Sequence, residues 1–387
     1  MIEGRGHDAG DRRIRLGMVG GGQGAFIGAV HRIAARLDNH YVLVAGALSS
    51  DPERARASAL ELGIEPDRAY HDFAAMARAE SAREDGIEAV AIVTPNNLHA
   101  PVATAFLKAG IHVICDKPLA TSVAEARELA RLAKESGKLF AVTYNYTGYP
   151  LIRHARAMVA AGELGEIRVV QIEYAQDWLT ERVEETGQKQ AAWRTDPAQA
   201  GAGGALGDIG THAYHLACFV SGLTLDSLCA DLTTFVPGRR LDDNAQILLR
   251  FHGGARGMLW ATQVAPGNEN GLRLRIYGTK GGLEWEQENP NVLRYAPFGE
   301  SPRLITRAGA GAGPAAARVT RIPAGHPEGY LEAFATLYAE IARAIRAARD
   351  GQPPEPDVSF PTVMDGLAGV EFIDAAVLSS ASGAVWI

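Results

Sequence analysis

Short apolar runs alternate with helix-forming segments along the first 145 residues, and this alternation restricts the fold more than any other feature of the sequence. The apolar runs cover residues 14–19, 41–47, 89–93, 112–115 and 140–143. Helices are predicted between them, over residues 26–37, 52–62, 73–80, 100–109 and 123–136. Strands and helices in this order build βαβ units around a parallel sheet. We therefore predict an α/β protein whose residues 13–145 form a doubly wound Rossmann domain.

A glycine-rich turn follows the first apolar run directly. Gly20, Gly22 and Ala25 fit the pattern Gly-x-Gly-x-x-Gly/Ala that opens a dinucleotide-binding βαβ unit. Glycine lets the backbone approach a pyrophosphate, whose charge is met by amides at the N-terminus of the next helix. A glycine turn without a ligand is the competing interpretation, and the strand before the turn and the helix after it argue against that interpretation. The turn predicts cofactor contacts at Gly20, Gly22, Gln23, Gly24, Ala25, Phe26 and Ile27.

The end of the second apolar run bears on the choice between NAD and NADP. An acidic residue there would bind the adenosine ribose and favour NAD, but Ser49 takes that place. Ser50 and Arg54 could hold a 2′-phosphate, while Asp51 is placed to cap the helix that starts at Pro52. NAD and NADP both remain open at this point.

The pattern changes after residue 145 and indicates a second domain over residues 146–387. Helices are predicted over residues 151–161 and 208–221, with a strand at 167–174 between them. Antiparallel strands are predicted over residues 244–251, 255–263, 272–277 and 283–287. The glycine- and alanine-rich stretch 303–322 is predicted to be an exposed excursion, and the last helices, 330–349 and 363–382, are able to pack back onto the first domain.

The composition narrows the class of partner. Lysine and arginine number 38 against 45 acidic residues, a net charge of −7 without long runs of either sign, which argues against nucleic acid or an anionic membrane. Three cysteines form no Cys-x-x-Cys pair, as expected in a reducing cytoplasm. Residues 2–5, Ile-Glu-Gly-Arg, look like a protease-cleavage linker, so residues 1–12 are expected to be a flexible N-terminus or a cloning remnant. A small-molecule substrate is the expected partner.

Several ordered motifs resemble the Gfo/Idh/MocA family of oxidoreductases. They are Thr94-Pro95-Asn96-Asn97-Leu98-His99, Asp116-Lys117-Pro118, Tyr144-Asn145-Tyr146, residues 203–212 and residues 276–285. The family commonly has Glu-Lys-Pro at the second motif, where this chain has Asp116. The resemblance implies a Rossmann domain, a second α/β domain with a large, mostly antiparallel open sheet used for oligomerisation, and a substrate pocket between the two. It adds cofactor contacts at Thr94, Pro95, Asn96, Asn97, His99, Asp116, Lys117, Pro118 and Asn145.

Lys117, Asp208 and His212 are the predicted catalytic residues. Lys117 follows a parallel strand at its carboxyl end, where its ammonium could hold a substrate hydroxyl and stabilise a developing alkoxide. Asp208, His212 and His215 share one face if their segment is helical, so that the carboxylate could orient the His212 ring. The resemblance implies substrate binding and general-base catalysis by Asp208 and His212, and a cis peptide before Pro118.

The Asp208–His212–His215 stripe has two other interpretations. A zinc site is disfavoured because no further ligand is evident, so no metal is predicted. A hydrogen-bonded core network is the second alternative.

Aromatic and charged residues of the second domain are predicted to border the cleft. Tyr146, Trp178 and Trp193 suit the apolar face of a sugar ring, and Arg194 suits an anionic substituent. His215 is expected only to line the pocket, and His326 is expected to be an ordinary loop histidine.

The sequence therefore predicts an NAD(P)-dependent dehydrogenase that oxidises a secondary hydroxyl of a sugar, a sugar derivative or a cyclitol. One alternative keeps the same residues in an NAD-dependent glycosidase that oxidises, eliminates, hydrates and reduces again. A second alternative is a non-catalytic nicotinamide-binding regulator, which has no need of Lys117 together with Asp208 and His212. A homodimer or homotetramer is expected, because an open sheet face needs a cover.

Overall fold

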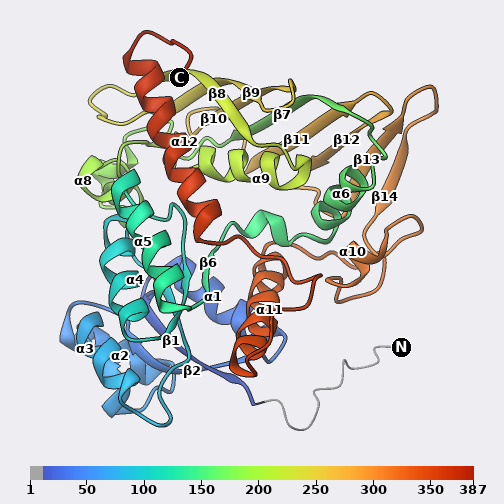
Figure 1. Ribbon diagram of the computed structural model, residues 1–387. Coiled ribbons are helices and arrows are strands. Elements are labelled where there is room, and N and C mark those ends of the chain that lie inside the picture. Colours follow the sequence, from blue (N-terminus) through green and yellow to red (C-terminus); the bar gives the residue numbers. More distant parts are fainter. Residues whose placement is uncertain (1–11) are drawn as a thin grey trace.

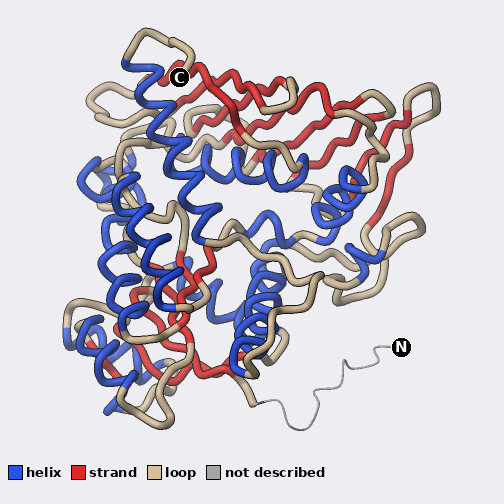
Figure 2. Tube along the Cα trace, viewed as in Figure 1, coloured by secondary structure: helices blue, strands red, loops and turns tan. Residues whose placement is uncertain are grey.

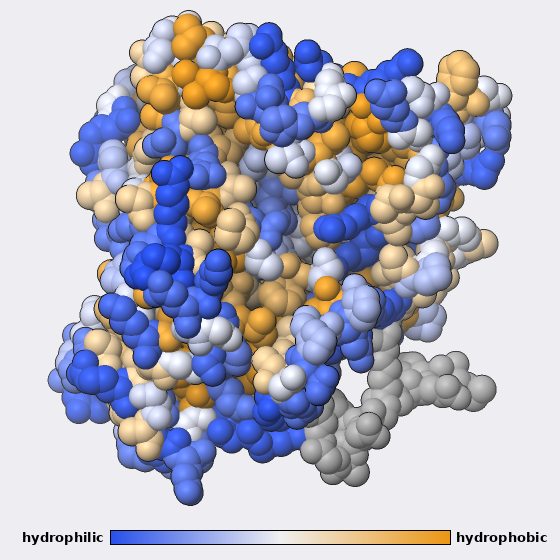
Figure 3. Space-filling view, in the orientation of Figure 1, coloured by the Kyte–Doolittle hydropathy of each residue, from blue (hydrophilic) through white to orange (hydrophobic). Residues whose placement is uncertain are grey.

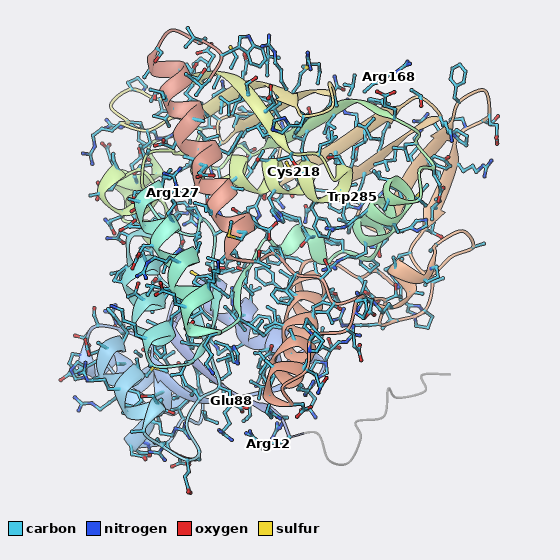
Figure 4. All side chains as sticks on the ribbon, in the orientation of Figure 1. Arg12, Glu88, Arg127, Arg168, Cys218 and Trp285 are labelled. Carbon is cyan, nitrogen blue, oxygen red and sulfur yellow. The ribbon has the colours of Figure 1, made fainter. Side chains whose placement is uncertain are left out.

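The computed structural model describes residues 12–387, which form two sheets joined by helices (Figure 1). The interpretation of residues 1–12 as a flexible N-terminus or cloning remnant falls outside the described residues, except for Arg12. The side chain of Arg12 donates to Glu88 over 2.9 Å, and Figure 4 labels both residues at one end of the molecule.

The N-terminal sheet is parallel throughout and confirms the predicted Rossmann class. Its strand order is β3-β2-β1-β4-β5-β6. The strands are β1 (Ile14–Gly20), β2 (Tyr41–Ala47), β3 (Ala69–Tyr70), β4 (Ala89–Val93), β5 (His112–Cys115) and β6 (Phe140–Val142). All five residues of β4 are buried, because helices cover both faces of the sheet (Figure 2).

The helices of this domain begin at recognisable caps. Asp51 accepts from the backbone N–H of Arg54 over 2.8 Å at the start of α2 (Pro52–Glu61), and Ser122 accepts from the backbone N–H of Glu125 at the start of α5 (Val123–Ser136). The helix α5 ends at Gly137, which takes the left-handed conformation with φ of 64°. The helices are α1 (Phe26–Leu37), α2 (Pro52–Glu61), α3 (Phe73–Ser81), α4 (His99–Lys108) and α5 (Val123–Ser136).

The C-terminal sheet has eight strands in the order β14-β13-β12-β11-β7-β10-β9-β8, and only the β7–β10 pair is parallel. The strands are β7 (Ile167–Ala175), β8 (Leu225–Thr233), β9 (Asn244–Phe251), β10 (Arg256–Thr262), β11 (Gly271–Gly278), β12 (Gly281–Glu286), β13 (Val292–Pro297) and β14 (Arg303–Thr306). This large, mostly antiparallel sheet also confirms the predicted fold class. Its inner face packs on α6 (Pro150–Ala160) and α9 (Thr211–Ser221), with Trp285 in that layer (Figure 4).

The stretch 303–322 differs from its prediction as an exposed excursion. It opens with edge strand β14 because Ile305 packs into the core, and Arg307 and Glu328 form a buried ion pair of 3.1 Å. The short helix α10 (Pro314–Ala317) then packs against α6.

Two late helices connect the sheets. Helix α11 (Tyr330–Arg349) packs on α1, and its Phe334 and Tyr338 belong to the Rossmann core. Helix α12 (Val363–Ala381) packs against both α5 and β8 (Figure 1). In the view of Figure 3, hydrophilic side chains dominate the Rossmann part, and apolar ones are more frequent over the second sheet. Within residues 12–387, no helix is long and apolar enough to cross a membrane.

Gly148 lies in the segment that leads into the second domain, and its backbone packs closely against helix α11. A Cβ atom at this position would lie 2.0 Å from the carbonyl oxygen of Ala333. We expect Gly148→Ala to lower the free energy of unfolding by about 2–4 kcal/mol, because neither backbone can yield without moving a helix.

Denaturant unfolding of the purified variant measures this change. Gly329→Ala is the matched control, since nothing lies within 4 Å of its added Cβ, and we expect a loss below about 1 kcal/mol. Equal losses in the two variants would contradict the proposed backbone clash.

Candidate functional site

A cavity of about 1170 Å³ joins the carboxyl edge of the parallel sheet to the second sheet. The glycine turn and the ends of β2 and β4 line one part, and residues of β7, α7 (Lys189–Arg194), α9 and α11 line the other. The volume exceeds the usual range for a drug-sized ligand, and it suits a dinucleotide together with a small substrate.

The glycine turn has the geometry of a phosphate cradle. Gly20, Gly21 and Gly24 have φ of 79°, 72° and 77°, a region that side chains disfavour. A Cβ at Gly22 would lie 2.7 Å from the carbonyl oxygen of Leu48. The helix that follows presents its first amides to the same space, so these residues fit the pyrophosphate of a dinucleotide.

Most of the predicted cofactor residues line this cavity. They are Gly20, Gly22, Gln23, Ala25, Phe26, Ile27, Ser49, Ser50, Arg54, Thr94, Pro95, Asn96, His99, Asp116, Lys117 and Asn145. Gly24 lies instead at a neighbouring hollow behind the turn. Asn97 and Pro118 also lie outside the cavity, and Pro118 lines a separate small hollow beside the start of α5.

The end of β5 places Lys117 at the centre of the site. The Lys117–Pro118 peptide is cis, as the resemblance implies. The ammonium Nζ of Lys117 donates to Oδ1 of Asp208 over 2.9 Å and also to its backbone carbonyl. Arg194 Nε donates to Oδ2 of the same carboxylate over 3.1 Å, and Gln263 Nε2 does so over 2.9 Å.

These donors control the ionisation of Asp208. Burial alone would raise the pKa of its carboxyl, but the charges of Arg194 and Lys117 hold that pKa well below its usual range. One carboxylate is therefore shared by two cations at the cavity wall.

The predicted contact between Asp208 and His212 is not formed. Residues 206–210 form a π-helical turn, and regular helix resumes only at Thr211. This wider turn and the pull of two cations direct the carboxylate toward Lys117 and Arg194, while the buried Nδ1 of His212 has no partner among the described residues.

His212 lies on the cavity wall among aromatic rings. The ring centroids of Tyr146 and Tyr144 lie 4.9 and 5.7 Å from its own. Burial and the nearby Lys117 ammonium hold the pKa of His212 well below its usual value, so the imidazole is neutral near pH 7.

Other predicted residues separate into two groups. Tyr146, Trp193 and Arg194 line the cavity. His215 does not, because its ring stacks on Tyr144 at 4.1 Å and its Nε2 lies 3.5 Å from Asp365. Trp178 and His326 also lie outside the cavity.

Two family models match the chain, one over the Rossmann domain and one over the first part of the second domain. The model described as an oxidoreductase family with an NAD-binding Rossmann fold matches residues 14–144, and the GFO/IDH/MocA C-terminal domain matches residues 152–284. The chain belongs to the Gfo/Idh/MocA oxidoreductase family. The predicted resemblance and the predicted NAD-binding domain are thereby confirmed.

Relatives with solved structures share the whole fold. An oxidoreductase from Sinorhizobium meliloti is 59% identical, with a TM-score of 0.89, over 97% of this chain and 99% of that one. An inositol dehydrogenase homolog from Azotobacter vinelandii, complexed with NADH and myo-inositol, is 38% identical, with a TM-score of 0.90 and 97% of each chain covered. In sequence comparison, the levoglucosan dehydrogenase of Pseudarthrobacter phenanthrenivorans is 29% identical over 74% of this chain and 76% of its own.

This Gfo/Idh/MocA member anchors Asp116 through residues that sequence reasoning missed. His31 of α1 is fully buried, and its Nε2 lies 3.0 Å from Oδ1 of Asp116. Its Nδ1 lies 2.8 Å from the Tyr338 hydroxyl on α11, and Thr143 Oγ1 donates to Asp116 over 2.5 Å. Burial opposes ionisation of Asp116, but His31 and Thr143 outweigh it and lower the pKa from 3.8 to about 2.

A wall of amide and phenol groups was also missed. Asn270 Oδ1 accepts from the Tyr174 hydroxyl over 2.7 Å and from Gln176 Nε2 over 2.9 Å, and Asn270 Nδ2 donates to Gln287 Oε1 over 2.9 Å. The alternation of polar and apolar residues in β7 indicates that one face of this strand is polar. It does not indicate which other strands lie beside that face at the cavity. Among the described residues, no group of three or more His, Cys, Asp and Glu side chains could hold a metal ion.

Acid titration tests the Asp116 anchor. A depressed folded pKa stabilises the protein above the unfolded pKa, and this contribution is lost as pH falls from about 4 toward about 2. We expect the stability advantage of the wild type over Asp116→Asn to shrink by about 1 kcal/mol between pH 6 and pH 3.

Urea unfolding at matched pH values gives the comparison. Glu53→Gln, a change at an exposed acid on α2, is the control and should leave the pH profile unchanged. A difference between wild type and Asp116→Asn that is constant with pH would contradict the assignment.

Proposed function

We propose that this protein is an NAD(P)-dependent dehydrogenase that oxidises a secondary hydroxyl of a sugar, a sugar derivative or a cyclitol. The observation that carries the proposal is that Lys117 and His212 line the same cavity as the glycine cradle. The named activities and ligand of the relatives, levoglucosan dehydrogenase and an inositol dehydrogenase homolog with myo-inositol, support the substrate class.

In the proposed reaction, Lys117 stabilises negative charge and His212 accepts a proton. The Lys117 ammonium, held by Asp208, donates to the substrate hydroxyl oxygen and stabilises negative charge that develops there. The neutral His212 imidazole accepts the hydroxyl proton. A nicotinamide cofactor bound in the glycine cradle would supply the acceptor for the hydride of the carbinol carbon. The carbinol thereby loses one proton and one hydride and becomes a carbonyl.

Asp208 acts in this scheme through the two cations and not through the His212 ring. Its carboxylate fixes Lys117 beside the cavity and ties it to Arg194 of α7. Ser49, Ser50 and Arg54 line the adenosine end, so the proposal includes NADP as well as NAD.

We also propose a homodimer or homotetramer in the cytosol. The outer face of the second sheet exposes Leu248 and Met258 by about half, and Phe235, in the loop after β8, is exposed by nearly two thirds. Exposed apolar side chains of this size on a sheet favour burial against another chain. The free cysteines agree with a reducing compartment.

Substitution of the proposed catalytic residues tests the chemistry. We expect Lys117→Ala and His212→Ala each to lower kcat/KM by about 10²–10⁴-fold, because charge stabilisation or the proton acceptor is lost. The measurement is NAD reduction, followed by absorbance, with myo-inositol, levoglucosan and other polyols as substrates.

Lys108→Ala, at an exposed lysine on α4, is the matched control and should retain activity. Product analysis with glycosides separates the alternative, since consumption of a glycoside without net cofactor reduction would assign the residues to a glycosidase. Full activity of both variants would sink the proposed roles.

Light scattering of the purified protein tests the assembly. We expect a mass of two or four chains at micromolar concentration, and Met258→Glu should shift it toward one chain because a charge would be buried in the interface. A monomeric wild type would refute this proposal. Lys134→Glu, on the Rossmann helix α5, is the control and should not change the mass.

A further inference from the structure

Among residues 12–387, each lysine or arginine that lines the substrate part of the cavity is paired with a carboxylate. Lys117 and Arg194 are the lysine and arginine that line it, and both bind the carboxylate of Asp208. Arg194 Nη1 also donates to the side-chain and backbone oxygens of Gln190, and its guanidinium lies 4.2 Å from the Trp193 ring. An anionic substituent on the substrate would have to compete with a buried carboxylate for both cations.

The remaining polar wall is neutral. Gln176, Asn270 and Gln287 line the cavity and are bound to one another through Asn270. The hydroxyls of Tyr146 and Tyr174 lie 2.5 Å apart and extend this network. Amides and phenols can donate to and accept from hydroxyl groups at several positions, but they do not supply the net positive charge that stabilises a carboxylate or phosphate.

The mouth of the cavity is acidic. Glu269 and Glu288 line it from the two chain segments beside Asn270 and Gln287, and both are exposed. Oε1 of Glu288 accepts from the backbone N–H of Asn270 over 2.8 Å, which holds this carboxylate at the rim. With Asp208 and Asp116, which also line the cavity, these rim residues make four carboxylates against the two cations Lys117 and Arg194.

We propose that this site selects uncharged polyhydroxylated rings and excludes sugar acids and sugar phosphates, with an ammonium-bearing ring tolerated better than an anionic one. This inference rests on the proposed dehydrogenase function and assigns the selection to the neutral wall and the acidic rim. We expect uncharged rings to bind most tightly, ammonium-bearing rings less tightly and anionic rings most weakly. Anionic rings bind most weakly because their charge is repelled by the carboxylates of the site and loses its hydration on binding.

Equilibrium binding tests the order without turnover. Glucose, glucosamine, glucuronate and glucose 6-phosphate form one matched series, and myo-inositol and myo-inositol 1-phosphate form another. Saturation-transfer NMR titrations with the NADH-loaded protein would give each dissociation constant. We expect the neutral member of each series to bind at least about 30-fold more tightly than its anionic counterparts.

A pair of rim substitutions tests the cause. Glu269→Gln combined with Glu288→Gln should reduce the ratio of neutral to anionic affinity by about three- to tenfold, as expected for two charges at partly solvated positions. Glu286→Gln is the matched control, because this acid lies on β12 but does not line the cavity, and its ratio should equal that of the wild type.

The outcomes separate this inference from the function on which it rests. An anion that binds as tightly as its neutral counterpart, or a ratio unchanged by the rim variant, would overturn the charge selection. The expected binding order without oxidation of any bound polyol would leave the selection intact and refute the dehydrogenase proposal.

Discussion

The carboxylate of Asp208 is the interaction on which the site depends. It accepts hydrogen bonds from Lys117 after a parallel strand, from Arg194 of α7, and from Gln263 directly after β10. Each of these groups comes from a different part of the fold, and the bond to Lys117 links the second domain to the Rossmann domain at the cavity wall. Because the carboxylate is buried, loss of any one donor removes a hydrogen bond that stabilises its ionised form.

The Rossmann domain was predictable because the patterns that define it lie in short, continuous segments of the sequence. Parallel strands covered on both faces are apolar along their length, and a strand followed by a glycine turn and a helix already defines a phosphate site. Lys117 could be found for the same reason, since it follows a strand at the edge where such folds bind ligands.

The substrate wall was less predictable because it depends on contacts between distant segments. Asn270 and Gln287 meet only through the antiparallel register of β11 and β12, and strand β8 was not identified because its residues are mostly half-exposed. The partners of Asp208 depend on a π-helical turn, which changes the direction of a side chain without a clear sequence signal. His31 gave no signal either, since its partners are 85 and 307 residues away.

Helix α11 has a consequence for how the chain is made. Phe334 and Tyr338 complete the core of a domain whose strands end at Val142, and Tyr41 donates a hydrogen bond to the carbonyl of Tyr338 over 2.9 Å. When the last strand of the parallel sheet has emerged from the ribosome, helix α11, which completes the core of that domain, has therefore not yet emerged. Nearly two hundred further residues must emerge first, so the nascent Rossmann half exposes an apolar face that chaperones can bind until synthesis is almost complete.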